Sequence, residues 1–257
     1  MSLRRLGLVI LFALLPSSAF AETHEEWTRL LETYVSESDD GVNRVDYAGL
    51  KNNAEDLAAL DTYIAKLAQD VIPDLPENDA DKFAAWSNLY NAITVRLIID
   101  NYPVDSIRDI KPSFISTGPW KKERIEVDGQ KMSLDDIEHG QLRVHWSDPR
   151  VHYAVNCASF GCPNLLRKAW VGETLDEDLD AAARDYVNNP RGVSVLDNGD
   201  LEVSKIYKWY REDFGGSTVG IISHLIEYAE PELKQKLTAE ASIDKYVYDW
   251  SLNEQEG

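Results

Sequence analysis

The sequence has only two cysteines, Cys157 and Cys162, and it lacks the spaced sets of cysteine and histidine that bind zinc. It contains no H-E-x-x-H helix, no Walker phosphate loop and no dinucleotide-binding glycine fingerprint. His139 near two cysteines five positions apart fits no standard zinc spacing. We therefore expect neither a metal nor another cofactor.

Long hydrophobic runs are also missing. The apolar run at residues 6–15 is too short to cross a bilayer as a helix, and no later run approaches that length. Arg4 and Arg5 precede this run, and the small residues Ala19 and Ala21 follow it at the cleavage positions, which is the pattern of a secretory signal peptide. We predict that residues 1–21 are removed near Ala21, and that the mature protein is extracytoplasmic, periplasmic or secreted, without stable membrane insertion.

Positive charge is scarce. The chain has 26 Lys and Arg against 45 Asp and Glu, for a formal net charge of −19. This balance disfavours nucleic acids and anionic membrane surfaces as partners. The acidic residues are spread along the chain, which is typical of a solvated surface and says little about a substrate.

The composition is that of a globular protein, with 44% hydrophobic residues, seven Trp and twelve Tyr. Apolar periodicity predicts helices, and Asp128-Gly129 and Asn198-Gly199 predict two hairpins. The helices are expected at residues 25–35, 47–69, 79–101, 133–144, 175–188, 206–213 and 219–228. We predict an α+β fold with a helix-rich N-terminal half on a modest, largely antiparallel sheet. A helical segment at 22–78 packs on a core domain at 79–257 that carries the site.

The most informative stretch is residues 150–163, which contains both cysteines. Residues 150–156 alternate like a strand and lead into Cys157, followed by small residues on a turn. This arrangement is typical of a nucleophile, with backbone N–H groups near Ala158 and Ser159 available to stabilise an oxyanion. The alternative is a Cys157–Cys162 disulfide, the default for two cysteines in a secreted protein. A helical segment would hold the two Cα atoms too far apart for a bridge, whereas a tight loop at Gly161 would permit one.

Two histidines are candidates for the base. His152 is closer in sequence, but along a strand it would face away from Cys157. His139 is therefore preferred, with His152 as the alternative base. Adjacent residues of a helix point in different directions, so Glu138 is poorly placed to orient the His139 ring. We expect Glu138 instead to bind Arg143 or to contact substrate.

A third polar group would orient the base or the substrate. Asn88 and Asn91 share one face of a helix amid apolar residues, and they are either structural ties or substrate donors. The remaining candidates are Arg143, Asp148, Asn156, Ser159 and Asp249. Trp209, Tyr210 and Phe214 recur at helical spacing and are expected in the core.

Five blocks of sequence resemble the domain of unknown function family 547. They lie at residues 86–92, 137–143, 148–159, 204–214 and 248–253. The resemblance implies similarity to papain-like and transglutaminase-like cysteine enzymes, which use a Cys-His pair and a third polar residue. This chain departs from their usual order, because its preferred histidine precedes the cysteine.

These observations predict a cysteine hydrolase or acyl transferase. Its substrate would be a small molecule or a peptide-like compound with an amide or other acyl bond. The alternative is a non-catalytic periplasmic binding or assembly module held by the disulfide. A thiol redox role is a weaker third reading, because the spacing is not C-x-x-C.

Overall fold

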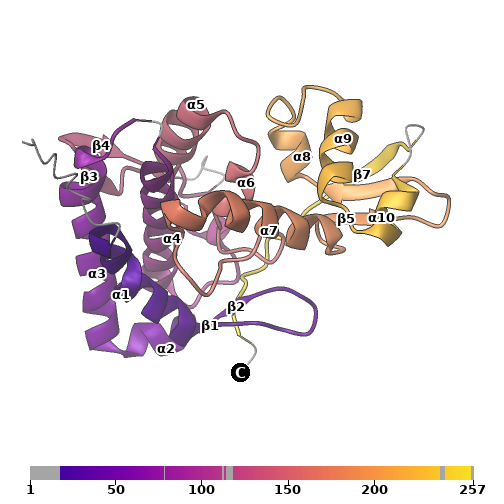
Figure 1. Cartoon of the computed structure of the whole chain (residues 1–257). Helices are drawn as coiled ribbons and strands as arrows, with labels where there is room; N and C mark the ends of the chain where they lie inside the picture. The colour runs from indigo at the N-terminus through magenta and orange to yellow at the C-terminus, as the bar shows by residue number, and fades with distance from the viewer. Residues whose placement is uncertain (1–17, 78, 112, 114–117, 238–240, 256–257) are drawn as a thin grey trace, which may run out of the picture.

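The computed structural model describes residues 18–77, 79–111, 113, 118–237 and 241–255. Helices predominate there over short strands, and Figure 1 shows a helical part in indigo to magenta beside a smaller orange and yellow part. This architecture confirms the α+β class. The predicted signal peptide lies outside the described residues except for 18–21, which open helix α1 (Ser18–Tyr34). Among the described residues, no helix combines the length and apolarity needed to span a bilayer.

Helix α4 (Ala80–Asn101) forms the centre of the helical part, and every side chain from Lys82 to Val95 is buried. A helix that is buried on all sides requires neighbours on each face. Helices α2 (Tyr47–Asn52) and α3 (Ala54–Lys66) and the π-helix η4 (Asp136–Leu142) all contact it. The helix that bears the predicted Asn pair is thus the core of the fold.

The helix predicted over 47–69 is interrupted at Asn53. The Asn53 side chain accepts hydrogen bonds from the amides of Glu55 and Asp56, both at 3.2 Å, and so caps α3. The last part of the predicted helix continues as the π-helix η1 (Leu67–Val71). The apolar spacing correctly predicted helical structure, but the cap at Asn53 that divides the helix was not predicted.

The strands form three small sheets among the described residues instead of one. Strand β1 (Val35–Ser36) pairs with β2 (Arg44–Val45), and β3 (Ile125–Val127) pairs with β4 (Gln130–Met132), both antiparallel. The third sheet has the order β5-β6-β7, with bounds Val193–Val195, Leu201–Ser204 and Ile243–Val247. Both predicted hairpins are present, whereas β7 was not predicted and pairs with β6 in parallel.

Residues 150–156, predicted as a strand, instead contain the short helix α6 (Val151–Ala154). The prediction was wrong because Asp148-Pro149 starts a helical turn. The Asp148 carboxylate accepts a hydrogen bond from the Arg150 amide at 2.8 Å, and proline suits a first helical turn. The chain becomes extended only at Val155.

The remaining helices complete the two parts. They are η2 (Ile72–Asp74), η3 (Ile107–Asp109), α5 (Arg143–Trp146), η5 (Gly172–Thr174), α7 (Leu175–Asn188), α8 (Ile206–Trp209), α9 (Thr218–Tyr228) and α10 (Pro231–Lys236). Helix α7 has its predicted bounds, while α8 ends four residues before its predicted end and continues as turns.

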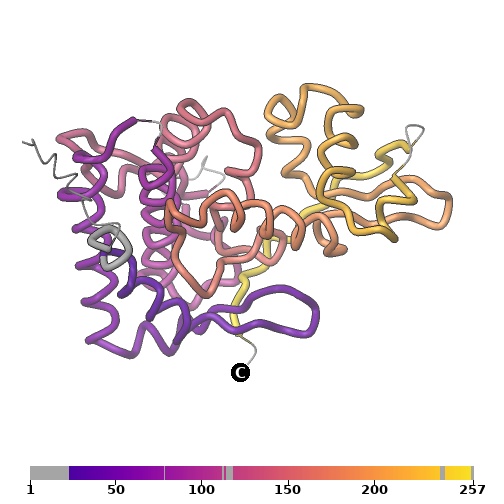
Figure 2. The backbone as a smooth tube through the Cα atoms, viewed as in Figure 1, coloured from indigo at the N-terminus to yellow at the C-terminus, as the bar shows by residue number. Residues whose placement is uncertain are grey.

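The segment after β7 joins the two parts. Figures 1 and 2 show it running from the β5–β7 sheet back toward β1 and β2. On its way the Gly161 amide donates to the Asp249 carbonyl at 2.9 Å, and the Phe160 amide donates to the Ser251 carbonyl at 2.8 Å. The C-terminal segment therefore pairs with the loop that carries both cysteines.

Candidate functional site

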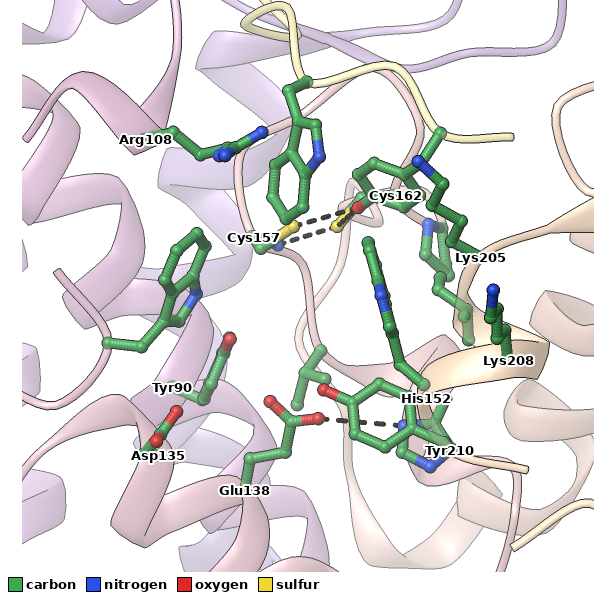
Figure 3. Close-up of a pocket in the computed structure, with 17 residues that line it drawn as sticks. Tyr90, Arg108, Asp135, Glu138, His152, Cys157, Cys162, Lys205, Lys208 and Tyr210 are labelled. Atoms are coloured by element: carbon green, nitrogen blue, oxygen red, sulfur yellow. Dashed lines mark hydrogen bonds and ion pairs between the residues drawn. The ribbon is translucent and has the colours of Figure 1, made fainter. Parts of the chain in front are cut away.

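A cavity of about 510 Å³ lies where the helical part meets α8 and the C-terminal segment. Figure 3 shows its lining side chains, which come from several separate segments of the chain. Those with chemistry to offer are Tyr90, Arg108, Asp135, Glu138, His152, Cys157, Cys162, Lys205, Lys208, Tyr210 and Tyr248. The fold thus brings both cysteines and one candidate base to a single pocket.

Cys157 occupies a sharp turn after α6. Ala158, the next residue, has the left-handed φ of 58°, which is uncommon for a residue with a side chain. The Asn156 side chain holds the turn, since its carbonyl accepts from the Ala158 amide at 2.8 Å and its amide donates to the Pro163 carbonyl at 2.7 Å. Asn156 therefore shapes the loop and has no place in the pocket lining.

Both cysteines are free thiols in this structure, which does not contain the Cys157–Cys162 disulfide considered as the alternative. The Cys157 amide donates to Cys162 Sγ at 3.0 Å, and the Tyr248 hydroxyl donates to the same sulfur at 3.2 Å. Cys157 Sγ lies 3.1 Å from the Tyr248 hydroxyl and 3.2 Å from Ser159 Oγ. We call Cys157, Ser159, Cys162 and Tyr248 the thiol cluster.

The two thiols have shifted pKa values of opposite direction. The hydrogen bond to Cys162, together with burial, raises the pKa of Cys157 well above its usual range. Burial also raises the pKa of Cys162, but hydrogen bonds from the Cys157 thiol and Tyr248 outweigh it and lower this pKa to about 7. The pair therefore loses its first proton near neutral pH and keeps the second, as one coupled unit.

His152, and not His139, is the histidine in the pocket. His139 is partly exposed, lies 3.0 Å from an Arg143 guanidinium nitrogen, and is absent from the lining. The preference for His139 rested on the strand expected at 150–156. Because those residues form α6 instead, the alternation that turned His152 away from Cys157 does not apply.

The His152 ring is held on three sides. Its Nε2 lies 2.7 Å from Asp213 Oδ2, its face stacks on Tyr210 at 3.8 Å between ring centroids, and its Nδ1 lies 3.7 Å from Glu138 Oε1. Burial lowers the pKa of His152. The neutral ring donates its Nε2 proton to Asp213, which leaves the Nδ1 lone pair as a base, as in the aspartate-imidazole pairs of hydrolases. We call Glu138, His152, Tyr210 and Asp213 the imidazole cluster.

Neither His139 nor His152 is hydrogen-bonded to Cys157. Among the described residues, the hydrogen-bond partners of Cys157 Sγ include no histidine nitrogen. Figure 3 shows the thiols at one end of the pocket and Glu138, His152 and Tyr210 together at the other. A thiolate in this site thus depends on the second thiol and not on an adjacent imidazolium.

Glu138 is buried and lines the pocket. It lies on the π-helix η4, a conformation frequent at functional sites. Arg143 does not pair with Glu138 as expected. It makes two hydrogen bonds to Asp213, at 2.6 and 2.8 Å, and these bonds together with that from His152 outweigh burial and hold the pKa of Asp213 well below its usual range.

The two asparagines of α4 are structural ties. Asn91 accepts from the Asn156 amide at 2.8 Å and donates to the Ala154 carbonyl at 2.9 Å. Asn88 likewise accepts a hydrogen bond from the Trp170 amide at 3.0 Å and donates one to the Trp170 carbonyl at 2.8 Å. Neither lines the pocket, so the structural reading of this pair is the one that the geometry supports.

A predicted oxyanion donor and the two candidate aspartates, Asp148 and Asp249, make other contacts. The Ala158 amide, one of those expected to stabilise an oxyanion, is bound to the Asn156 side chain and is not available. The Cys157 amide next to it is likewise bound, to Cys162 Sγ. Asp249 caps Ser251 with its carboxylate and is exposed outside the pocket. The Asp148 carboxylate binds Arg150.

Sequence reasoning missed several contributors to the site. Trp209 and Tyr210 were expected in the core, yet both line the pocket, and Trp209 is 46% exposed; Phe214 is buried as expected. Trp120, Tyr248, Trp250 and Asp213 were assigned no role. Tyr248 and Asp213 stand within blocks that the family resemblance singled out, which was the available signal. Among the described residues, no three His, Cys, Asp or Glu side chains are placed to hold a metal.

Residues 76–187 match the family model described as Protein of unknown function, DUF547. This segment of the chain resembles the DUF547 family. Neither the curated proteins nor the solved structures yield a match.

The DUF547 segment supplies both cysteines, Glu138 and His152. The residues after it complete both clusters, since Asp213 orients His152 and Tyr248 donates to Cys162. The pocket is thus assembled from the DUF547 segment and the C-terminal part of the chain.

Proposed function

We propose that this protein is an extracytoplasmic cysteine-dependent hydrolase or acyl transferase that acts on an amide or other acyl bond. One observation carries the proposal: Cys157 lies on a sharp turn in a pocket, and its amide donates a hydrogen bond to a second free thiol whose pKa is lowered to about 7. A thiolate near neutral pH is the form that attacks carbonyl carbon. The signal-peptide pattern of residues 1–21 supports the location.

In the acylation step the thiol pair starts with one proton. That proton lies on Cys157, because Cys162 is the more acidic thiol. Cys157 passes it to the Cys162 thiolate as Cys157 Sγ attacks the carbonyl carbon and forms a carbon–sulfur bond. The bond to the leaving group then breaks, and the leaving group departs with its electron pair and takes the proton from Cys162. The result is a thioester on Cys157 and a thiolate on Cys162.

In the second step His152 Nδ1 accepts a proton from water or from an acceptor hydroxyl or amine. The activated oxygen or nitrogen attacks the thioester, and the carbon–sulfur bond breaks to release Cys157 as a thiolate. The protonated His152 then returns its proton to the thiol pair. Asp213 stabilises the transient imidazolium and keeps the ring in place.

A single-turnover experiment tests these roles. The exported protein, with an N-terminus near Glu22, is treated with p-nitrophenyl acetate, and acetylation is located by mass spectrometry. We expect acetyl on Cys157 and none in Cys157→Ser. His152→Gln is expected to acylate but to release acetate about 10²-fold more slowly. His145→Gln, a histidine outside the pocket, serves as the control. Acetylation at other residues, or at no residue, contradicts the proposal.

The adjacent thiols favour one second candidate, a dithiol oxidoreductase. A disulfide substrate would be attacked by one thiolate to give a mixed disulfide, and the other cysteine would then displace the remaining thiol to form a Cys157–Cys162 bond. This chemistry requires Cys162 as the second sulfur of the disulfide, whereas in acylation Cys162 carries only a proton and Cys157 alone forms the covalent bond. Oxidised glutathione with the wild type and Cys162→Ser separates the two: rapid formation of the internal disulfide without acetyl transfer favours the oxidoreductase.

A further inference from the structure

We infer that the pocket takes acyl substrates that carry an anionic group, an inference that rests on the proposed acyl chemistry at Cys157. Three cationic side chains, Arg108, Lys205 and Lys208, line the same cavity as the thiols. Among the described residues, none of the three has an ion pair with a carboxylate within 4.0 Å. A cavity lined by unpaired cations is a place for a negatively charged ligand.

These three cations contrast with the net negative charge of the molecule. The chain has a formal net charge of −19, and carboxylates pair with many of its other cations, as Asp213 does with Arg143 and Asp180 with Arg150. The three pocket cations come from two separate segments: Arg108 lies in η3, and Lys205 and Lys208 lie at α8. Three unpaired cations at one cavity of an acidic protein would concentrate anions there, where the surrounding surface repels them.

The charges in the pocket are also segregated. Figure 3 shows Arg108 and Lys205 at the level of the two cysteines and Lys208 below them, whereas Asp135 and Glu138 lie at the other end with His152. An anionic group beside the thiols therefore meets positive potential. The water or acceptor that His152 is proposed to activate lies toward the carboxylates instead.

Aromatic side chains form the wall between the cations. Trp209 and Trp250 lie 5.5 Å apart between ring centroids, and Trp250 packs 4.5 Å from Tyr248. The Arg108 guanidinium sits 5.2 Å from the Trp250 ring centroid. Such a wall strengthens the attraction between the cations and an anion by excluding water. It also fits an apolar or flat body on the substrate.

Two alkylating probes that share one reactive group test this inference. Iodoacetate is an anion and iodoacetamide is neutral, so the ratio of their rate constants with Cys157, divided by the same ratio for 2-mercaptoethanol, isolates the effect of charge. We expect this normalised ratio to exceed one by about five-fold or more at low salt and to fall as salt rises. For an acidic protein without a local cationic site, the ratio would lie below one.

Variants assign the effect to the three cations. Arg108→Gln, Lys205→Gln and Lys208→Gln are each expected to lower the ratio, and the triple variant to bring it to one or below. Lys234→Gln removes the same charge from α10, outside the pocket, and is expected to leave the ratio unchanged. A wild-type ratio of one with ready alkylation by both probes overturns the anionic preference alone. Failure of both probes to label Cys157 overturns the proposed nucleophile itself.

Discussion

Cys162 sets the acid–base behaviour of Cys157 because the two thiols share a hydrogen-bond network that contains no imidazole. Cys162 receives hydrogen bonds from the Cys157 amide and the Tyr248 hydroxyl, which stabilise a negative charge on that sulfur. Cys157, which is more exposed, is the sulfur that a ligand reaches. Cys162 is thus the sulfur that first becomes negatively charged. Transfer of one proton from Cys157 to Cys162 moves that charge to Cys157.

Substitution of Cys162 by serine is expected to raise the pH at which Cys157 reacts. The first ionisation of the pair lies near 7 because Cys162 is the acidic member. Serine does not ionise in this range, so Cys157 is expected to titrate near or above the ordinary thiol value of about 8.5. The rate of iodoacetamide labelling of Cys157 between pH 6 and 10 measures the midpoint. A midpoint unchanged from the wild type would show that Cys162 does not lower it.

The chain's local signals decide how far its elements could be predicted. Asp128-Gly129 and Asn198-Gly199 fix their hairpins locally, since both loops need positive φ values, and Gly129 and Gly199 supply them at 73° and 88°. Strand β7 depends on a partner about forty residues earlier, so no local pattern reveals it. The same holds for Asp213, whose partner His152 lies 61 residues away. Cys157 was identified from its turn, whereas its partners required the tertiary structure.

The contact between the cysteine loop and the C-terminal segment depends on Gly161. A Cβ atom at this position would lie 2.8 Å from the Asp249 carbonyl oxygen and 2.9 Å from the Asp249 nitrogen, closer than packed atoms allow. The segment that bears Tyr248 would have to move. Glycine is therefore required here by the approach of two backbones and not by a left-handed conformation.

Gly161→Ala is expected to lower the free energy of unfolding by about 1–3 kcal/mol, because the added methyl group overpacks the contact. It is also expected to raise the midpoint of cysteine labelling, since displacement of Tyr248 removes a donor from Cys162. Urea denaturation and the labelling profile measure the two effects. Gly140→Ala, where a Cβ meets nothing within 4 Å, is the matched control and is expected to change neither appreciably. Equal behaviour of both variants would contradict this account of the contact.

At the scale of the whole molecule, three buried histidines couple folding to pH. Burial lowers the pKa of His24 and of His224 to about 4, and it also lowers that of His152. The folded state therefore binds fewer protons than the unfolded state between about pH 4 and 6.5. Stability is full above the unfolded value of about 6.5 and falls as the pH decreases through this window. Asp81 and Asp185, whose pKa values burial raises, act in the opposite direction.

We expect the free energy of unfolding to fall between pH 7.5 and 4.5, with about 2–3 kcal/mol lost for each of His24 and His224. Urea denaturation at intervals across this range measures the slope. His224→Gln is expected to flatten it, because glutamine gains no proton on unfolding, and Tyr153 retains a hydroxyl contact with Tyr207 at 3.2 Å. His145→Gln, at a partly exposed position outside these clusters, controls for the loss of a histidine as such. A slope that is the same in the wild type and in His224→Gln would show that protonation of this buried ring does not limit stability in acid.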